Sequence, residues 1–370
     1  DRVPQALWSN TERPVVIIHP GIVGDRGASA LDWAITNELP NWGVTALQAV
    51  EEMDAGPVWA TCEFNLPAGL RKSELYNGRV SDAAIRCIRE VVEKFVEGFE
   101  PVALDYADAK VRGRLQPNMK QVDRSFSWHD CARFIKRCID AADGQPGVLA
   151  SLAGGQYYVY DAHLDSRSGM PGEILAVHDD AVLVAAGDQS LWIGSLRRKP
   201  QPGEETFKQP ARHLLAEQLA DVPVLDWSIA TQPFSDEAYQ PLRYRESGIV
   251  GELTLEFYNG AMSTEQCQRL VAALRWAKSR DTQVLLIKGG RGSFSNGVHL
   301  NVIQAAQDPG AEAWANIQAI DDVCAELLTA RQLVVSGVTG NAGAGGVMLA
   351  LAADIVFARA DIVLNPHYKS

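Results

Sequence analysis

The segment Val15–Gly27, VVIIHPGIVGDRG, restricts the fold of this chain more than any other stretch. Its first four residues are β-branched and apolar, which predicts a buried parallel strand that ends at His19. Pro20 and the glycines after it predict tight turns and a close approach of the backbone to a ligand. Open α/β sheets bind their ligands at such strand ends, so we expect a functional site here.

A second segment supplies a partner for His19. Residues 43–65 are typical of strand, turn and strand, with Asp54 in the turn sequence MDAGP. A carboxylate beside a histidine fixes the tautomer of the imidazole and raises its basicity, which suits acid–base catalysis. A lone histidine at a strand end also occurs as a purely structural residue, and the sequence leaves this alternative open.

These two segments resemble the catalytic core of the formyltransferases that use 10-formyltetrahydrofolate. The stretch from His19 to Ile35, HPGIVGDRGASALDWAI, is similar to the HypX (HoxX) family of hydrogenase maturation factors. The resemblance implies that His19 and Asp54 handle the formyl group. The chain departs from the family at Ile17, because the formyltransferases usually carry an asparagine there and isoleucine cannot donate a hydrogen bond.

The same resemblance implies a folate pocket around His19. Residues 3–8 are similar to the family segment that lies along this pocket, so Pro4 is a candidate cofactor-binding residue, and so is Gly21 in the turn. Asp25 and Arg26 follow in the same loop. They either form a surface ion pair or bind a polar ligand, and both alternatives fit the sequence.

Composition limits the kinds of partner. The chain has 370 residues, 46% hydrophobic and 22% charged, which suits two or three globular domains. Its formal net charge of -12 argues against a nucleic-acid partner. The six cysteines form no C-x-x-C pair, so we expect no disulfide framework, no metal site and a cytoplasmic location. We also expect no membrane span, because no apolar run is long enough.

Periodicity predicts the elements of the remaining chain. Spacing of apolar residues at three and four predicts helices over residues 28–39 (with Ser29 as N-cap), 73–99, 128–142, 211–220, 263–279 and 311–330. Short apolar runs between turn residues predict strands over residues 148–152, 156–164, 172–178, 181–187, 190–196, 249–257, 283–287 and 333–338.

Two glycine clusters follow strands in the last third of the chain, in KGGRGSFSNGVHL and GNAGAGGVML. They are either two tight turns or an oxyanion hole, in which two backbone N–H groups converge on one carbonyl oxygen. Residues 294–300 and 340–355 resemble the two motifs of the crotonase (enoyl-CoA hydratase/isomerase) superfamily. The resemblance implies that the N–H groups of Val298 and Gly345 hold the thioester oxygen of an acyl-CoA, with Gly297 and Gly346 beside them.

Other crotonase positions are less conventional. Met348 stands where hydratases carry a glutamate, which argues against hydration by paired carboxylates. Tyr368 is a polar participant that the resemblance suggests, and a tyrosine packed at a strand end is the alternative. Lys288 and Arg291 are candidate ligands of the CoA phosphates by charge alone.

The fold class that follows is α/β, apparently incomplete at both chain ends. We expect a partial Rossmann-like formyltransferase domain over residues 1–120 and a small antiparallel β-barrel-like domain over 121–200, which resembles the formyltransferase C-terminal domain. Residues 201–247 are expected to be a proline-rich linker, and residues 248–370 an α/β crotonase-like domain.

The two resemblances together imply one function. Formyl transfer from 10-formyltetrahydrofolate to coenzyme A, followed by decarbonylation of formyl-CoA, would yield CO for the [NiFe]-hydrogenase active site. Hydrogenase maturation proteins are then the expected partners. The alternatives are a formyltetrahydrofolate hydrolase, another formyltransferase, or a CoA-binding scaffold without catalytic activity.

Overall fold

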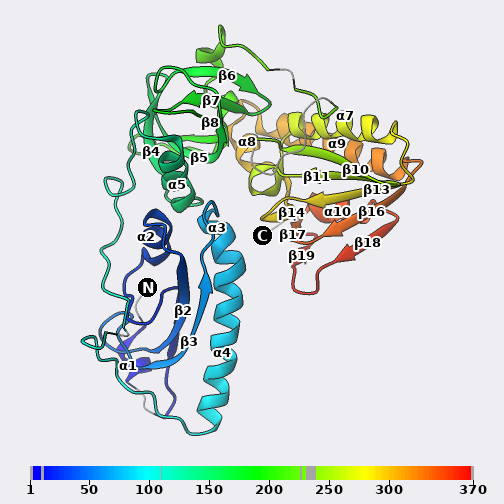
Figure 1. Ribbon diagram of the computed structural model, residues 1–370. Helices are drawn as coiled ribbons and strands as arrows, with labels where there is room; N and C mark the ends of the chain where they lie inside the picture. The colour runs from blue at the N-terminus through cyan, green and yellow to red at the C-terminus, as the bar shows by residue number, and fades with distance from the viewer. Residues whose placement is uncertain (1–2, 10–11, 110, 226, 231–238, 368–370) are drawn as a thin grey trace. The chain divides into compact units, whose positions relative to one another are not determined.

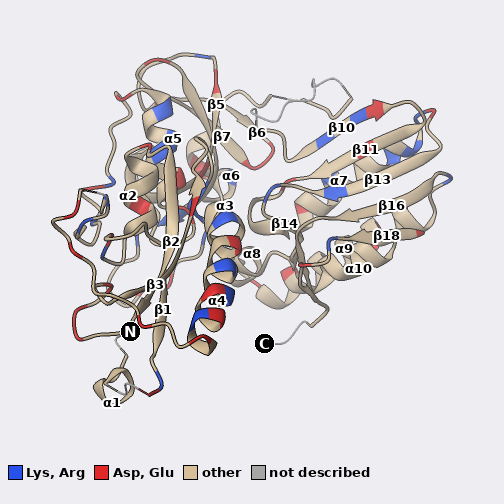
Figure 2. Ribbon diagram, turned by 60° about the horizontal axis from the view of Figure 1, so that its bottom comes forward, with Lys and Arg blue, Asp and Glu red and all other residues tan. Residues whose placement is uncertain are grey.

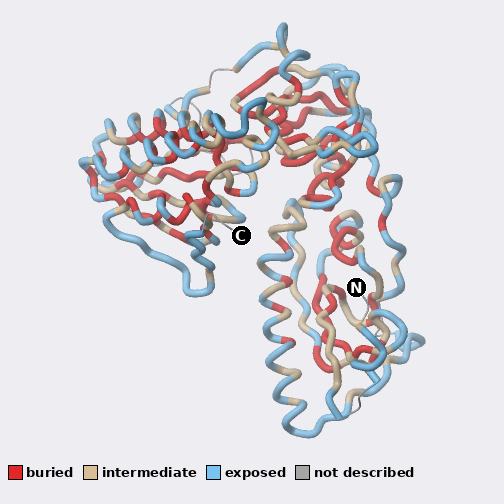
Figure 3. The backbone as a smooth tube through the Cα atoms, turned by 180° about the vertical axis from the view of Figure 1, so that it is seen from behind, coloured by how far each residue is buried: buried red, intermediate tan, exposed pale blue. Residues whose placement is uncertain are grey.

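The computed structural model describes residues 3–9, 12–109, 111–225, 227–230 and 239–367 (Figure 1). The chain divides into two compact units, one with residues 1–127 and 133–148 and the other with residues 128–132 and 149–370. Each unit has its own cluster of buried apolar side chains. Buried residues of every kind are red in Figure 3. The α/β class expected from the sequence is confirmed.

The first unit is built on a three-stranded sheet of order β1-β2-β3. β1 (Val16–His19), β2 (Asn41–Gln48) and β3 (Val58–Asn65) pair antiparallel, which confirms the predicted strand, turn and strand. The parallel pairing expected for β1 is wrong within the described residues. A short β-branched run fits either kind of sheet, so only the tertiary structure decides its partner.

Helices cover this sheet. α2 (Ala30–Thr36) follows the glycine turn, and α3 (Lys72–Leu75), the π-helical turn η1 (Tyr76–Val80) and α4 (Ser81–Val96) form the long predicted helix. Basic and acidic residues are interspersed along α4 (Figure 2). Ser29 occupies the N-cap position of α2, but its hydroxyl accepts the Met119 N–H at 3.0 Å instead of capping the helix. The unit also contains α1 (Gln5–Trp8) and α5 (Ala132–Ala141), which crosses into the second unit at Ala132.

The second unit begins with the predicted β domain. Its sheet has the order β4-β5-β8-β7-β6, and the strands are β4 (Val148–Leu152), β5 (Gly155–Asp165), β6 (Ile174–His178), β7 (Ala181–Ala185) and β8 (Ser190–Arg198). β9 (Gln209–Pro210) pairs with β8, and α6 (Ala211–Leu214) and the 3₁₀ turn η2 (Ala216–Leu219) replace the predicted single helix. In the part of the chain that is described, the sheet is open and does not close into a barrel.

A five-stranded sheet of order β10-β11-β13-β16-β18 forms the rest of the unit. It contains β10 (Leu242–Ser247), β11 (Val250–Leu255), β13 (Val284–Gly289), β16 (Leu333–Val338) and β18 (Ile355–Ala358). β10 pairs antiparallel with β11, and the other neighbours are parallel. β10 lies inside the segment expected to be a linker, where the alternation of Leu242 and Tyr244 with two arginines was a strand signal that the prediction overlooked.

Helices and short strands surround this sheet. α7 (Thr264–Lys278) and α9 (Pro309–Leu328) share one apolar core with β11 and β13. The glycine clusters form the short strands β12 (Ala261–Met262), β14 (Ser293–Ser295), β15 (Gly297–Val298), β17 (Asn341–Gly343) and β19 (Leu364–Asn365), with the 3₁₀ turn η3 (Tyr258–Gly260) and helices α8 (Leu300–Ala305) and α10 (Gly345–Leu351). Among the described helices, none is long and apolar enough to cross a membrane.

Candidate functional site

His19 is held at the end of β1 by its neighbour β2. The two strands are in register so that His19 faces Thr45. The Thr45 hydroxyl donates to the Gly21 carbonyl at 2.8 Å, and the Trp42 indole N–H donates to the Pro20 carbonyl at 2.8 Å. Because both side chains come from β2, these hydrogen bonds hold the turn after His19 against the sheet. They thereby fix the position of the imidazole.

The imidazole of His19 lies between two carboxyl groups. Its Nε2 is 2.9 Å from Asp25 Oδ2, and its Nδ1 is 3.5 Å from Asp54 Oδ2. Asp54 adopts a positive φ of 57° in the turn after β2, and its Oδ2 accepts the Gly27 N–H at 3.3 Å. The structure therefore brings together the two residues that the formyltransferase resemblance implied, and adds a third.

Asp25 is that third residue, and its surroundings exclude an ion pair with Arg26, while a role of either residue in ligand binding stays a prediction. It is only 2% exposed, and burial is the main influence that raises the pKa of its carboxyl group above the usual range. Arg26 instead pairs with Glu52, and its guanidinium lies 4.4 Å from the ring centre of Tyr106. The surface ion pair between Asp25 and Arg26 is therefore wrong, because Asp25 turns inward to His19.

Gly21 is needed for this close packing. A Cβ atom at Gly21 would stand 2.4 Å from His19 Nε2 and 2.5 Å from Asp25 Oδ2, closer than any real contact. The backbone thus packs directly against the contact between the histidine and the aspartate.

Two other predicted positions lie apart from this cluster. Ile17 pairs with Leu47 in the sheet, one of the partly buried residues of β1. Pro4 is exposed at the start of α1, so its role in folate binding stays a prediction.

The second site lies where the two glycine clusters meet. β15 runs parallel to β12, and the His299 N–H donates to the Met262 carbonyl at 3.1 Å. Because N–H groups alternate sides along a strand, the N–H of Val298 points away from β12. Gly297 has a φ of 75°, and a Cβ on it would stand 2.6 Å from the backbone nitrogen of Gly345. The predicted turns are thus packed against each other.

Gly346 and Met348 continue this site into α10. A Cβ at Gly346 would stand 2.0 Å from the Ser295 carbonyl oxygen, so the start of α10 also packs on the first glycine turn. Met348 is 41% exposed on the same helix. Tyr368 lies outside the described residues, and His367 is exposed near the end of the described chain.

His299 follows β15 and is the N-cap residue of α8. Its Nδ1 accepts the Val302 N–H at 3.3 Å at the start of α8, so a neutral ring carries its proton on Nε2. Burial lowers the pKa of the imidazole to about 4.

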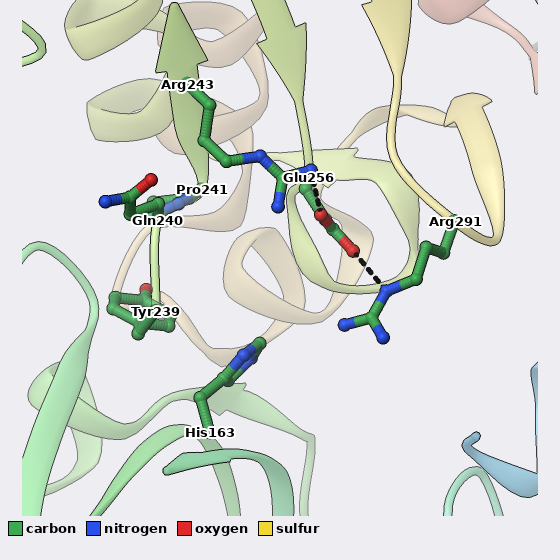
Figure 4. Close-up of a pocket in the computed structure, with 7 residues that line it drawn as sticks. All are labelled: His163, Tyr239, Gln240, Pro241, Arg243, Glu256 and Arg291. Carbon is green, nitrogen blue, oxygen red and sulfur yellow. Dashed lines mark hydrogen bonds and ion pairs between the residues drawn. The ribbon is translucent and has the colours of Figure 1, made fainter. Parts of the chain in front are cut away.

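The two basic candidates for binding CoA phosphates are already engaged with carboxylates. Lys288 Nζ lies 2.5 Å from Glu252, and Arg291 Nε donates to Glu256 at 3.1 Å. Figure 4 shows Arg243 approaching the same Glu256 from the other side, above a small pocket lined by His163 and Tyr239. Each cation thus already has a partner of opposite charge, and phosphate binding by either residue stays a prediction.

Three side chains of the second unit come close enough to hold a metal ion together, namely Asp180, His213 and Glu265. Asp180 Oδ2 accepts hydrogen bonds from Arg269 at 2.6 Å and from Gln266 at 2.7 Å. A guanidinium in this position disfavours a second cation, so we interpret the group as an ion-pair network.

Sequence reasoning missed two contributors to the first site. Asp25 was expected to bind a ligand or pair on the surface, although its spacing of six residues from His19 across a glycine turn is compatible with a return contact. Thr45 carried no signal, because a threonine in a strand is ordinary and only the register with His19 gives it a role.

Comparison with known proteins agrees with this architecture. Residues 118–211 match the formyl transferase C-terminal domain, and residues 247–364 match the enoyl-CoA hydratase/isomerase family. The hydrogenase maturation factor HoxX of Bradyrhizobium diazoefficiens is 40% identical over 99% of this chain and 62% of its own length. The resemblance to the HypX/HoxX family is confirmed.

Solved structures give the same result. HypX from Aquifex aeolicus in complex with tetrahydrofolic acid has a TM-score of 0.92 and 39% identity, over 100% of this chain and 64% of that chain. The chain therefore spans less than two thirds of the length of these HypX and HoxX proteins. A methionyl-tRNA formyltransferase from Sorangium cellulosum is 27% identical over 52% of the chain and 62% of its own length.

Proposed function

We propose that the protein transfers a formyl group from 10-formyltetrahydrofolate to coenzyme A and then releases CO from formyl-CoA for [NiFe]-hydrogenase maturation. The observation that carries this proposal is a buried histidine whose two ring nitrogens both face carboxyl groups, at 2.9 and 3.5 Å. The similarity of the chain to HypX from Aquifex aeolicus, whose structure has been solved in complex with tetrahydrofolic acid, supports a folate as the formyl donor.

In the first step the sulfur of CoA attacks the formyl carbon. A tetrahedral intermediate forms, the bond between the carbon and N10 of the folate breaks, and N10 takes a proton. His19 handles that proton as a general acid–base catalyst, and Asp54 orients its ring through Nδ1. The step yields formyl-CoA and tetrahydrofolate without any change in oxidation state.

In the second step the glycine turns of the crotonase-like region bind the thioester. The N–H groups of Val298 and Gly345 hold the formyl oxygen, where donors fixed in advance stabilise developing negative charge. Loss of the formyl hydrogen as a proton and departure of the thiolate give CO and CoA, again without a redox partner. Tyr368 remains the proposed polar participant in this proton transfer.

CO release from the purified protein tests the proposal directly. The protein is incubated with 10-formyltetrahydrofolate and CoA, CO is trapped on a haem protein, and formate is measured in parallel. We expect CO that requires CoA, and a loss of about 10² to 10⁴-fold in His19→Gln. The exposed His129 gives the matched control His129→Gln, which should keep full activity.

Other outcomes would overturn the proposal in distinct ways. Formate without CO, at a rate indifferent to CoA, would make the protein a formyltetrahydrofolate hydrolase. Binding of CoA without any consumption of the formyl donor would favour a scaffold.

A further inference from the structure

The position of His19 between two carboxyl groups limits how many protons the cluster holds. The exposed fractions of the side chains are 5% for His19, 2% for Asp25 and 9% for Asp54. A neutral imidazole has one N–H and can donate to only one carboxylate. With both carboxyl groups ionised beside a neutral ring, the buried cluster would hold two uncompensated negative charges, which is costly away from water. The geometry therefore favours a second proton, either on the ring or on one of the carboxyl groups.

The two carboxyl groups differ in their surroundings. Asp54 lies 3.5 Å from His19 and also accepts a hydrogen bond from the backbone N–H of Gly27 at 3.3 Å, whereas Asp25 lies 2.9 Å from His19. Asp25 is more deeply buried, and burial raises the pKa of its carboxyl group, an effect that the charge of Asp54 reinforces. The second proton therefore belongs to the short contact between Asp25 and His19 Nε2.

The backbone packs closely against this contact. Gly21 packs against Nε2 and Asp25 Oδ2, as its missing Cβ shows. A Cβ at Gly113 would stand 2.0 Å from the backbone nitrogen of Asp25, so the chain also packs tightly on the backbone of this residue. With Gly21 against it and only 5% and 2% of the two side chains exposed, the pair is kept from bulk water, so its proton is retained in the resting protein.

We propose that Asp25 is a positioning residue that stores, on the contact with His19 Nε2, the proton that formyl transfer requires. Only the identity of the substrate rests on the proposed function. As the bond between the formyl carbon and N10 breaks, His19 passes the shared proton to N10, leaving Asp25 as a carboxylate beside a neutral imidazole. Ionisation of the next CoA thiol reloads the pair, so protons balance over each turnover.

The location of the proton can be tested without substrate. The ring ¹⁵N signals of His19, assigned by their absence in His19→Gln, are followed against pH in the wild type, Asp25→Asn and Asp25→Glu. Asp32→Asn is the matched control, because Asp32 is also buried in the first unit but pairs with Lys72 and Arg124, at 3.2 and 3.1 Å. We expect a titration step at Nε2 in the wild type, Asp25→Glu and Asp32→Asn that is absent from Asp25→Asn. Identical titration curves for the wild type and Asp25→Asn would overturn the proposal.

Formyl-transfer rates provide the second readout. Asp25→Asn should lower kcat/KM by about 10² to 10⁴-fold and remove one limb of the pH profile, which Asp25→Glu should restore. An unchanged profile shape in Asp25→Asn would reduce Asp25 to a structural residue. If Asp25→Asn fails to fold, as judged by circular dichroism, Asp25→Glu carries the test. This variant should show both the wild-type shape of the pH profile at full rate and the titration step at Nε2 of His19, and a missing step would overturn the proposal. If no variant and no wild type transfers formyl to CoA, the proposed function fails, whereas the ¹⁵N titration still decides the role of Asp25.

Discussion

The two candidate sites of this protein rely on opposite parts of the polypeptide. The His19 site consists of titratable side chains that are buried and face one another. The candidate site at Gly297 and Gly345 is built from two glycine turns that pack against each other, where Gly297 and Gly346 leave no room for a Cβ, and the N–H groups that it would offer belong to the backbone. The first site therefore depends on the protonation of side chains, whereas the second depends on the shape of the backbone.

Among the variants that compare the two sites through their supports, the largest effect is expected from adding a methyl group to the backbone site. Gly297→Ala places a Cβ 2.6 Å from the Gly345 nitrogen at a φ of 75°. Disturbing an oxyanion donor typically costs about 10² to 10³-fold in rate, so CO release from formyl-CoA should fall by this factor while formyl transfer is retained. Gly292→Ala is the control, since a Cβ there meets no described atom within 4 Å. Equal loss of both activities would mean that the two sites do not act separately.

A smaller effect is expected when the pH is lowered, which should reduce the folding stability of the second unit through His299. Because the pKa of His299 is lowered to about 4 from 6.5, folding favours the neutral ring, and this contribution to stability is present above pH 6.5 and is lost as the pH falls toward 4. The free energy of unfolding should fall by about 2 kcal/mol between pH 7.5 and 5 from this residue. His299→Asn, which can still accept the Val302 N–H, should show a flatter pH dependence in urea unfolding. The same slope in both proteins would contradict the burial of this histidine.

The hydrogen bond from Thr45 that supports the His19 site should contribute about as much to the free energy of unfolding as other buried hydrogen bonds. Thr45→Val leaves the Gly21 carbonyl without its hydroxyl donor and should lower the free energy of unfolding by about 1 to 3 kcal/mol. Formyl transfer should fall with it, because the turn that positions His19 loosens. Thr61→Val is the matched control on the neighbouring strand, where the hydroxyl bond is longer, at 3.3 Å, and the residue is exposed. A Thr45 variant with wild-type stability and rate would show that the turn needs no such support.

The smallest effect is expected from the basic residues near the backbone site. Lys288→Ala and Arg291→Ala each remove an ion pair with a glutamate that is partly exposed to solvent, and such pairs contribute about 0 to 1 kcal/mol. The affinity for CoA, measured by calorimetry, should change by less than about 5-fold. A loss of tenfold or more in either variant would instead support the phosphate contact suggested by the sequence.

Much of the second unit could be predicted from the sequence alone. β16 has the predicted bounds, Leu333–Val338, and α7 begins after Ser263, whose side chain caps it. These features depend on residues a few positions apart, so periodicity and capping signals suffice. β10 was overlooked because its alternation lies between a proline-rich segment and a glycine, where a linker is also plausible.

The candidate sites show the same division between features set by neighbouring residues and features set by tertiary contacts. The sequence by itself determined which turns hold His19, Asp54, Val298 and Gly345, because residue types at fixed spacing define a strand end and a glycine turn. Only the tertiary structure decided that Asp25 turns inward to His19, that Arg26 pairs with Glu52, and that β1 is antiparallel to β2. The physical reason is that turn geometry is a local property of the chain, whereas burial and the pairing of charges depend on residues that only folding brings together.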